Sequence, residues 1–255
     1  MKSFPEIAIS GDRVDAKTLI EPGTNGLKFW AVLVAVIGSL VGILASYGIL
    51  LIVLLFYPLV AWFLHRKATA RIHASGVRVG PSQFPEIHRC VETFKARLGL
   101  QRDVDVYIVE ANVVNAVAVR YGKKNVVLLT DDLIHGCLLA ENPKTLSFVI
   151  GHELAHIALN HNGVFRSWMA QGLKKLGRLD EYSADRVALQ LVGDRVIAFN
   201  GLLLLTVGPA LVPYVNVEAV VAQAKEVVAN TYTKKAERQL THPLLLNRVN
   251  RVLTA

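Results

Sequence analysis

The sequence predicts an α+β domain that is mainly helical with a small sheet, preceded by an N-terminal transmembrane hairpin of two helices. Residues 29–64 form a run of 36 without a charged residue or a histidine. Strand-like segments follow between residues 104 and 130, and from Pro143 onward the pattern is mainly helical. Strands first and helices afterwards are typical of the α+β class.

The apolar run is too long for one transmembrane helix. As a continuous helix it would measure about 54 Å, against about 30 Å for the hydrocarbon core of a bilayer. A single span would have to tilt beyond the usual range of about 0 to 40°. We therefore expect two short spans, residues 29–45 and 49–64, that turn around Ser46, Tyr47 and Gly48.

Basic residues lie on both sides of the apolar run, whereas the expected turn carries no charge. Lys28 precedes the run, and Arg66, Lys67 and Arg71 follow it. By the positive-inside rule both flanks are cytoplasmic. The pattern predicts a multi-pass protein of the cell (inner) membrane whose main domain lies in the cytoplasm.

The chain divides into three expected regions. The first 27 residues mix acids and bases among glycines and prolines, which predicts a tail with little fixed structure. The expected regions are a cytoplasmic N-terminal tail at 1–27, the transmembrane hairpin at 28–65 and one domain at 66–255.

The charge and the cysteines indicate the surroundings of the protein. The formal net charge is +8 at pH 7, but no nucleic-acid motif accompanies it. Attraction to anionic lipid headgroups explains this excess more simply, so the predicted partner is the lipid bilayer and not a nucleic acid. Cys90 and Cys137 lack the CxxC spacing of metal sites, and we interpret them as ordinary buried or half-buried thiols.

The domain begins with a helix and continues with strands. Apolar residues have helical spacing in 86–98, and Gly99 ends this segment. Two strand-like runs follow at 104–109 and 125–130, with a third candidate strand at 113–119.

A second hydrophobic stretch covers residues 196–215. We interpret it as a buried core helix that breaks near Gly208 and Pro209, and a third membrane span is the alternative.

Residues 151–161 read GHELAHIALNH and lie on a helix that the pair Asn142 and Pro143 is expected to start. His152 and His156 are about 40° apart around the helix axis, so both imidazoles can reach one zinc ion. Glu153 is adjacent to that face and can reach a water on the metal. This is the HExxH pattern; two core histidines with a solvated glutamate are the alternative.

His161 is less suited to the same metal. On a continuous helix it lies about 140° from His156, so it is expected to point elsewhere and to have a surface or structural role. Metzincins require a glycine and a histidine where this chain has Leu159 and Asn162, which excludes that class.

A catalytic zinc needs a third protein ligand and one open position. The best candidate segment is LDEYSADR, residues 179–186. Glu181 and Asp185 are four residues apart on a predicted helix, so one can bind the metal while the other orients a ligand histidine. The alternative is an exposed acidic face in which Asp185 pairs with a base.

From about Gly76 to its end the chain resembles the membrane-anchored zinc metalloprotease family that includes HtpX and the CAAX prenyl endopeptidase. The likeness rests on ordered segments: GVRVGPSQFPEI, VNAVAV, VVLLTDDLI, HELAHIALNH, EYSADR and THPLLLNRV. It implies a zincin-like fold and one Zn²⁺ per chain. The implied ligands are His152, His156 and Glu181, and the implied catalytic base is Glu153.

The resemblance implies further roles for five residues. Asp185 would support the metal ligands from outside, and Asn115 and Ala116 would lie on an edge strand that holds the substrate backbone by strand addition. His242 would stabilise the oxyanion, and Arg248 would help to position that region. An exposed helix cap and a surface base are the alternatives for these last two residues.

Residues 162–180 depart from the family, because they are too short for the further transmembrane pair of HtpX-type members. Apolar and basic residues alternate here at helix-like spacing in VFRSWMAQGLKKLGR. Two interpretations stay open: a basic amphipathic segment that touches the membrane or covers the cleft, and a plain connector packed on the domain.

The combined prediction is a zinc endopeptidase at the cytoplasmic membrane surface that acts on protein or peptide substrates. Resemblance to HtpX implies a role in protein quality control. An intramembrane protease is disfavoured, because polar residues bracket fewer than 18 apolar positions around the HExxH motif. A non-proteolytic membrane adaptor or chaperone with a structural zinc site is the alternative. No oligomeric state is predicted.

Overall fold

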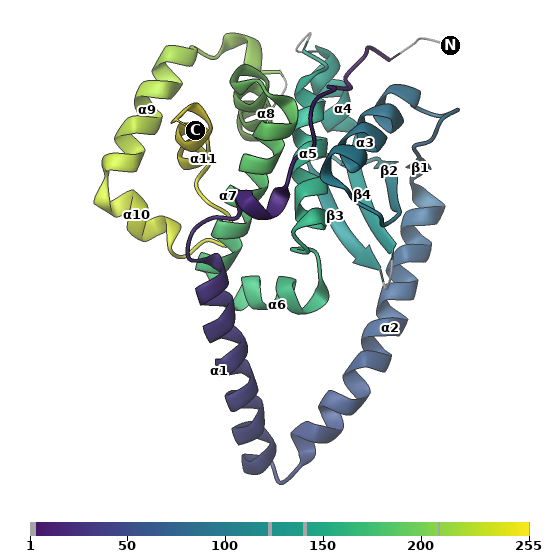
Figure 1. The fold of residues 1–255 in the computed structure, drawn as a ribbon, viewed down its shortest axis with the longest axis vertical. Coiled ribbons are helices and arrows are strands. Elements are labelled where there is room, and N and C mark those ends of the chain that lie inside the picture. The colour runs from purple at the N-terminus through teal and green to yellow at the C-terminus, as the bar shows by residue number, and fades with distance from the viewer. Residues whose placement is uncertain (1–3, 122–123, 140–141, 209, 255) are drawn as a thin grey trace.

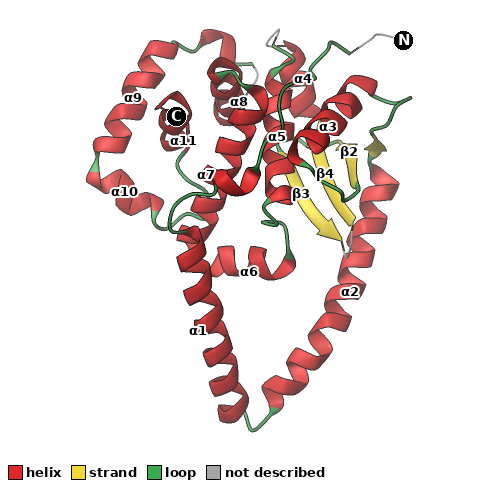
Figure 2. Cartoon of the chain, viewed as in Figure 1, coloured by secondary structure: helices red, strands yellow, loops and turns green. Residues whose placement is uncertain are grey.

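A computed structural model describes residues 4–121, 124–139, 142–208 and 210–254 of the chain. The described chain is mostly helical, and one small mixed sheet lies beside the central helices (Figures 1 and 2). The predicted mainly helical α+β class is confirmed.

Two long helices project from the domain. They are α1 (Thr24–Ala45) and α2 (Ile49–Ser75), and they meet at the expected turn, where Tyr47 and Gly48 have positive φ angles of 50° and 86°. The helices diverge from this turn as the arms of a V (Figure 1). Among the described residues, α1 alone is long and apolar enough to cross a membrane, with a mean hydropathy of 2.3 and no buried residues in its apolar window. A crossing by α2, whose apolar part Ile49–Val60 is shorter, stays a prediction.

The segment before α1 is packed on the domain, so the expectation of little fixed structure was wrong. Ile7 and Val14 are buried in the core. The segment runs past α3 (Pro85–Leu98) and α7 (Lys174–Val192), and Arg97 of α3 donates to the carbonyl oxygens of Ile9 and Asp12. Single apolar residues among charged ones have no period, so their burial depends on a groove that only the folded domain provides.

The N-terminal segment ends in an ionic contact with the domain. Glu21 is almost buried, its carboxylate lies 2.8 Å from Arg251, and its backbone N–H donates to Ser183 at 2.9 Å. This contact lies just before α1 begins at Thr24, so α1 leaves the domain beside α7.

The sheet has the order β1-β2-β4-β3, with strands Val77–Arg78, Val104–Val109, Lys124–Thr130 and Ala116–Tyr121 in that order. The parallel pair is β2 with β4, whereas β1 and β3 are antiparallel to their neighbours. The two predicted strands are confirmed, and the third candidate is a strand that begins three residues later than expected. The short β1 has too few residues for a period to be recognised. β3 is an edge strand, with Ala118 opposite Val127.

Helix α5 (Thr145–Ala158) lies in the middle of the domain and is almost entirely buried. The helix was expected to start at Asn142 and Pro143, but it begins at Thr145. Asn142 and Pro143 belong instead to a preceding turn, in which the backbone N–H of Thr145 donates to the carbonyl of Asn142. α8 (Arg195–Val207) is a buried core helix, as predicted, and it ends at Gly208. The expected break at Pro209 falls outside the described residues.

Shorter helices complete the domain. They are η1 (Ala16–Leu19), α4 (Asp131–Leu139), α6 (Val164–Gly172), η2 (Val212–Tyr214), α9 (Val217–Ala229), α10 (Thr231–Glu237) and α11 (Leu245–Thr254).

Replacement of Arg97 by methionine is expected to release the N-terminal segment. The substitution keeps the apolar stem but removes the donors to two backbone carbonyls of the segment, as well as those to the carbonyls of Gln190 and Leu191 on α7. Hydrogen bonds from a charged group contribute about 1.5–3 kcal/mol each. Amide hydrogen exchange in residues 4–20 should accelerate by at least about tenfold, which corresponds to about 1.4 kcal/mol.

Lys95→Met on the same helix is the matched control, because Lys95 pairs only with the exposed Glu92 among the described contacts. Equal protection of residues 4–20 in Arg97→Met and in the unchanged protein would show that these hydrogen bonds do not hold the segment.

Candidate metal centre

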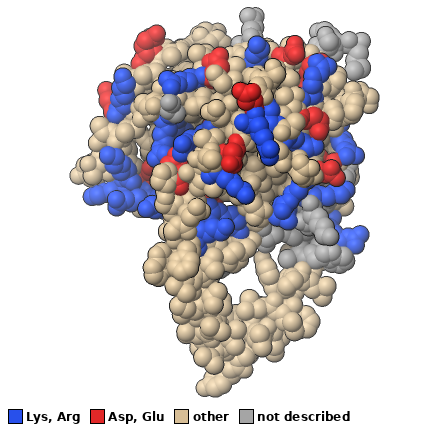
Figure 3. Space-filling model, viewed as in Figure 1, with Lys and Arg blue, Asp and Glu red and all other residues tan. Residues whose placement is uncertain are grey.

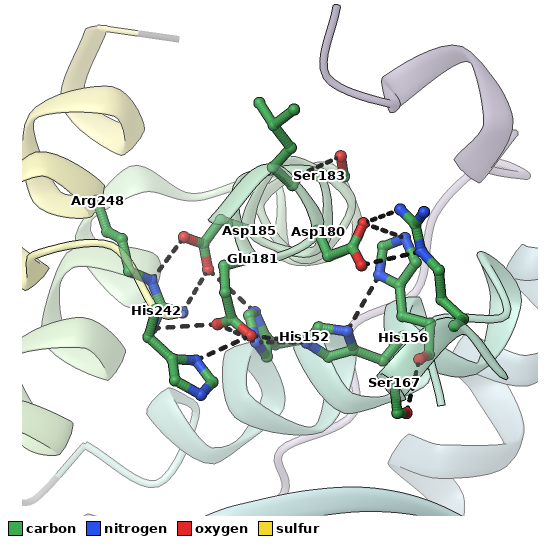
Figure 4. A network of polar contacts seen from close by, with 12 residues as sticks. His152, His156, Ser167, Asp180, Glu181, Ser183, Asp185, His242 and Arg248 are labelled. Carbon is green, nitrogen blue, oxygen red and sulfur yellow. Dashed lines mark hydrogen bonds and ion pairs between the residues drawn. The ribbon is translucent and has the colours of Figure 1, made fainter. Parts of the chain in front are cut away.

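The site is built where α7 packs on α5. Gly151 and Ala188 are small and face each other, and a Cβ built on Gly151 would lie 3.5 Å from the Cα of Ala188. The two helices therefore approach closely, and Glu181 of α7 faces His152 and His156 of α5 (Figure 4).

Three donor atoms converge between these helices. The Nε2 atoms of His152 and His156 are 3.1 Å apart. Glu181 oxygens lie 3.4 Å from His152 Nε2 and 3.5 Å from His156 Nε2. Ligand atoms around a tetrahedral zinc with bonds of about 2.0–2.1 Å lie about 3.3 Å apart. The donor set and its spacing therefore fit a zinc ion with two imidazoles, one carboxylate and an open position.

Asp185 lies behind the first ligand histidine. Its Oδ1 is 3.0 Å from His152 Nδ1, and Arg248 donates to both carboxylate oxygens at 2.8 and 2.7 Å. Asp185 is buried, so it is not part of an exposed acidic face. Of the two candidate carboxylates, the structure directs Glu181 to the donor cluster and Asp185 to the outer nitrogen of His152.

His161 does not point away from His156, and this expectation was wrong. The helix ends at Ala158, and Asn160 adopts the left-handed conformation with φ 58°. His161 N–H bonds to the carbonyl of His156 at 2.8 Å, and Asn160 N–H bonds to that of Ile157 at 3.1 Å. This pair of bonds is a Schellman motif, which turns the chain back on the last helical turn.

The reversal brings the His161 ring onto the second ligand histidine. His161 is buried, and its Nδ1 lies 3.1 Å from His156 Nδ1. The angle of about 140° holds only for a helix that continues, and the left-handed residue invalidates it. Asparagine is frequent at this position, so Asn160 followed by polar residues and Gly163 was a usable signal for the helix end.

The buried charges shift the pKa values of the candidate ligands. Burial would lower the pKa of His152, but Asp185 and Glu181 outweigh it and raise this pKa to about 10. Burial, with a smaller contribution from His152, lowers the pKa of His156 to about 4. Burial would raise the pKa of Glu181, but His152 and His242 hold it well below its ordinary value. Without metal, therefore, His152 is protonated and His156 is neutral between about pH 4 and pH 10.

Glu153 is buried beside the donor cluster and faces a cavity of about 470 Å³. Burial raises the pKa of its carboxyl group, while His152 and a hydrogen bond from the backbone of Ala118 act in the opposite direction. This bond connects Glu153 to the edge strand β3. Asn115 and Ala116 also line the cavity, so the predicted substrate-binding residues lie on its wall.

His242 and Arg248 both reach the site from the C-terminal part of the chain. His242 Nδ1 lies 3.2 Å from Glu181, and its side chain is 73% exposed at the cavity. Helix α11 begins only at Leu245, so His242 is not a helix cap. Arg248 is buried on Asp185 and is not a surface base.

Helix α6 and the residues after it connect α5 to α7, pack on the domain and line the cavity beside Glu153. Arg166 forms a buried ion pair with Asp180, and Arg178 donates to the carbonyl of Leu240 at 2.6 Å. Ala170 and Gln171 line the cavity. α6 lies across the space between α1 and α2, just below the domain (Figure 1). Two basic side chains of residues 162–180, Arg166 and Arg178, therefore form contacts within the domain.

Zinc binding at pH 6 is expected to displace about one proton from the protein, because metal binding requires a neutral imidazole. His152, with a pKa of about 10, is protonated at this pH, whereas His156, with a pKa of about 4, is neutral. Affinity should therefore rise about tenfold per pH unit, since the pH lies below the higher pKa. Calorimetry at pH 6 in two buffers of different ionisation enthalpy measures the released proton, and no release would contradict the prediction.

Comparison with known proteins agrees with this geometry. The model of peptidase family M48 matches residues 81–174, a segment that includes the histidine helix and stops before Glu181. No curated protein matches the chain at a significant level. The family match indicates a metallopeptidase, and the position of Glu181 beside the two histidines, beyond the matched residues, comes from the packing of α7 on α5. Over residues 81–174 the chain is therefore similar to peptidase family M48, the family that contains HtpX and the CAAX protease.

Proposed function

We propose that the protein is a membrane-anchored, zinc-dependent endopeptidase. The observation that carries this proposal is the convergence of His152, His156 and Glu181 at the separations of a tetrahedral zinc site, with Glu153 beside them in a cavity. The family match supports peptide-bond hydrolysis with a metal.

The proposed chemistry divides between the metal and the chain. When bound, zinc polarises the scissile carbonyl and makes a water more acidic. Glu153 takes a proton from the attacking water and delivers it to the leaving amine. Its burial supports this role, because a raised pKa makes the carboxylate a stronger base. His242 is exposed at the cavity beside Glu181 and donates to the developing oxyanion.

Strand addition on β3 is the proposed way in which the substrate binds. The backbone N–H of Thr130 in β4 donates to the carbonyl of Asn115, just before β3. In this antiparallel pair, the backbone groups of every second residue of β3 therefore face β4. Ala116 and Ala118 then direct their backbone groups away from β4. The N–H of Ala116 donates to Asn115 Oδ1 at 2.9 Å and that of Ala118 donates to Glu153, so their carbonyl oxygens are the groups proposed to pair with a substrate. An extended peptide paired with this edge would pass the metal ligands and would be held mainly by its backbone.

A location at the cytoplasmic face of the cell (inner) membrane is also proposed, with the lipid bilayer as partner. The arms of the V show no charged residue over most of their visible length, whereas Lys and Arg gather on the domain (Figure 3). We also propose a hairpin at 28–65 and a catalytic domain at 66–255, and this distribution of charge supports the division. Substrates that are damaged membrane proteins, and hence a quality-control role, are consistent with such a location.

The alternative is an adaptor or chaperone in which zinc has only a structural role. The cavity disfavours it, because a structural zinc site is normally closed by four protein ligands, and among the described residues this one has three donors and an open side.

Glu153→Gln tests the proposal. The purified chain in detergent should cleave an unfolded model protein, and the variant should be at least about 100-fold slower while it retains zinc, because general bases contribute about 10²–10⁴-fold. Matched zinc content is verified in both proteins before their rates are compared.

Glu92→Gln is the control variant, because it makes the same chemical change on the exposed side of α3 and should keep full activity. Zinc bound in every variant without cleavage by the unchanged protein would favour the adaptor.

A further inference from the structure

Each metal-binding imidazole needs a partner for its second nitrogen. If Nε2 faces the metal, then Nδ1 carries the proton and must donate it, or a buried N–H is left without an acceptor. For His152 this nitrogen lies 3.0 Å from Asp185. For His156 it lies 3.1 Å from another imidazole, that of His161.

The second contact belongs to a buried chain of polar groups. His161 Nε2 lies 3.3 Å from Asp180 Oδ1, and Arg166 forms a two-pronged ion pair with the same carboxylate. Arg166, Asp180 and His161 are all more than nine-tenths buried. Burial of such groups costs free energy unless each donor meets an acceptor. The sequence of contacts from Arg166 through Asp180 and His161 to His156 therefore restricts which nitrogen carries each proton.

The order of the groups determines how the protons are arranged. The guanidinium of Arg166 only donates, so Asp180 accepts from it as a carboxylate. Asp180 can then accept only a proton that His161 carries on Nε2. In the neutral ring that leaves His161 Nδ1 as an acceptor, which matches the proton on His156 Nδ1.

Each of the two ligand histidines is thus supported by a carboxylate that is paired with an arginine. Asp185 with Arg248 stands behind His152, and Asp180 with Arg166 stands behind His156. Both carboxylates come from α7, on either side of Glu181 (Figure 4). The difference between the sets is that His161 bridges His156 to its carboxylate.

We propose that His161 is a positioning residue: its Nδ1 accepts the Nδ1–H of His156, and with Asp180 and Arg166 it orients the His156 ring toward the metal. The proposal rests on the proposed zinc site. Partners of this kind usually contribute about 10–100-fold to metal affinity. His161 itself does not touch the metal position.

Two substitutions separate this role from a merely structural one. His161→Phe keeps a ring but removes the acceptor, whereas His161→Asn retains an acceptor oxygen close to the place of Nδ1. Zinc dissociation constants are measured on the metal-free full chain in detergent, by competition with a chromophoric chelator. His161→Phe is expected to bind zinc about 10–100-fold more weakly than the unchanged protein, and His161→Asn is expected to recover part of this loss.

Melting of the metal-free proteins is the second readout, and Cys137→Ala is the matched control. It removes a buried side chain outside the cluster, so it should lower the melting temperature without a change in zinc affinity. A His161→Phe protein that behaves like this control has lost only packing, and the proposal is then wrong.

The remaining outcomes are also decisive. Equal zinc binding by the unchanged protein and both His161 variants overturns the positioning role and leaves the peptidase proposal intact. An unchanged protein that fails to bind zinc in this assay overturns both. Equal loss in His161→Phe and His161→Asn would show that an acceptor at this position is not what His156 requires.

Discussion

The close packing of α7 against α5 is the contact on which the rest of the site depends. Helix α5 contributes imidazoles and Glu153 to the centre, and the other carboxylates around it in the described part of the chain come from one stretch of α7. Gly151 and Ala188 set the approach of the two helices. A larger side chain between them would separate Glu181 from the histidines by more than a zinc ion can bridge, because its bonds are about 2.0–2.1 Å long.

The same packing buries several carboxylates close together, and arginines from neighbouring helices compensate their charge. Asp180, Glu181 and Asp185 are all buried, and three carboxylates in one apolar interior would not stay ionised without compensation. Arg166 arrives from α6 and Arg248 from α11, so each outer carboxylate has a guanidinium. Glu181 differs from these two carboxylates, because it accepts no short hydrogen bond from a guanidinium. Its partners include the imidazoles of His152 and His156 at 3.4 and 3.5 Å, and Arg248 at 3.6 Å, so it remains suited to bind a cation.

Helix α1 is connected to this arrangement through the N-terminal segment. Glu21 lies just before α1, and it contacts Ser183 of α7 and Arg251 of α11. Arg251 also stacks on the ring of Tyr182, 3.8 Å from its centroid. Both helices contribute side chains to the metal centre, so the orientation of α1 and the position of Glu181 are parts of one packed unit.

The sequence by itself determined the elements with a strong local signal. The length of the uncharged run 29–64 predicted the helical hairpin and its turn, because a single helix of 36 residues is too long to cross a bilayer. Helical spacing put His152, Glu153 and His156 together, since residues four apart share a face whatever surrounds them. These predictions depend on covalent geometry and local periodicity, and the structure has the same elements at nearly the same residues.

Tertiary structure decided whatever depends on two segments meeting. Spacing alone could not choose between Glu181 and Asp185, because that choice depends on how α7 is rotated about its axis against α5. It also could not bury Ile7, which needs a groove formed by residues far along the chain. His161 shows the limit most clearly: one left-handed residue ends the helix periodicity, and the side chain returns to the histidine from which an ideal helix would have separated it.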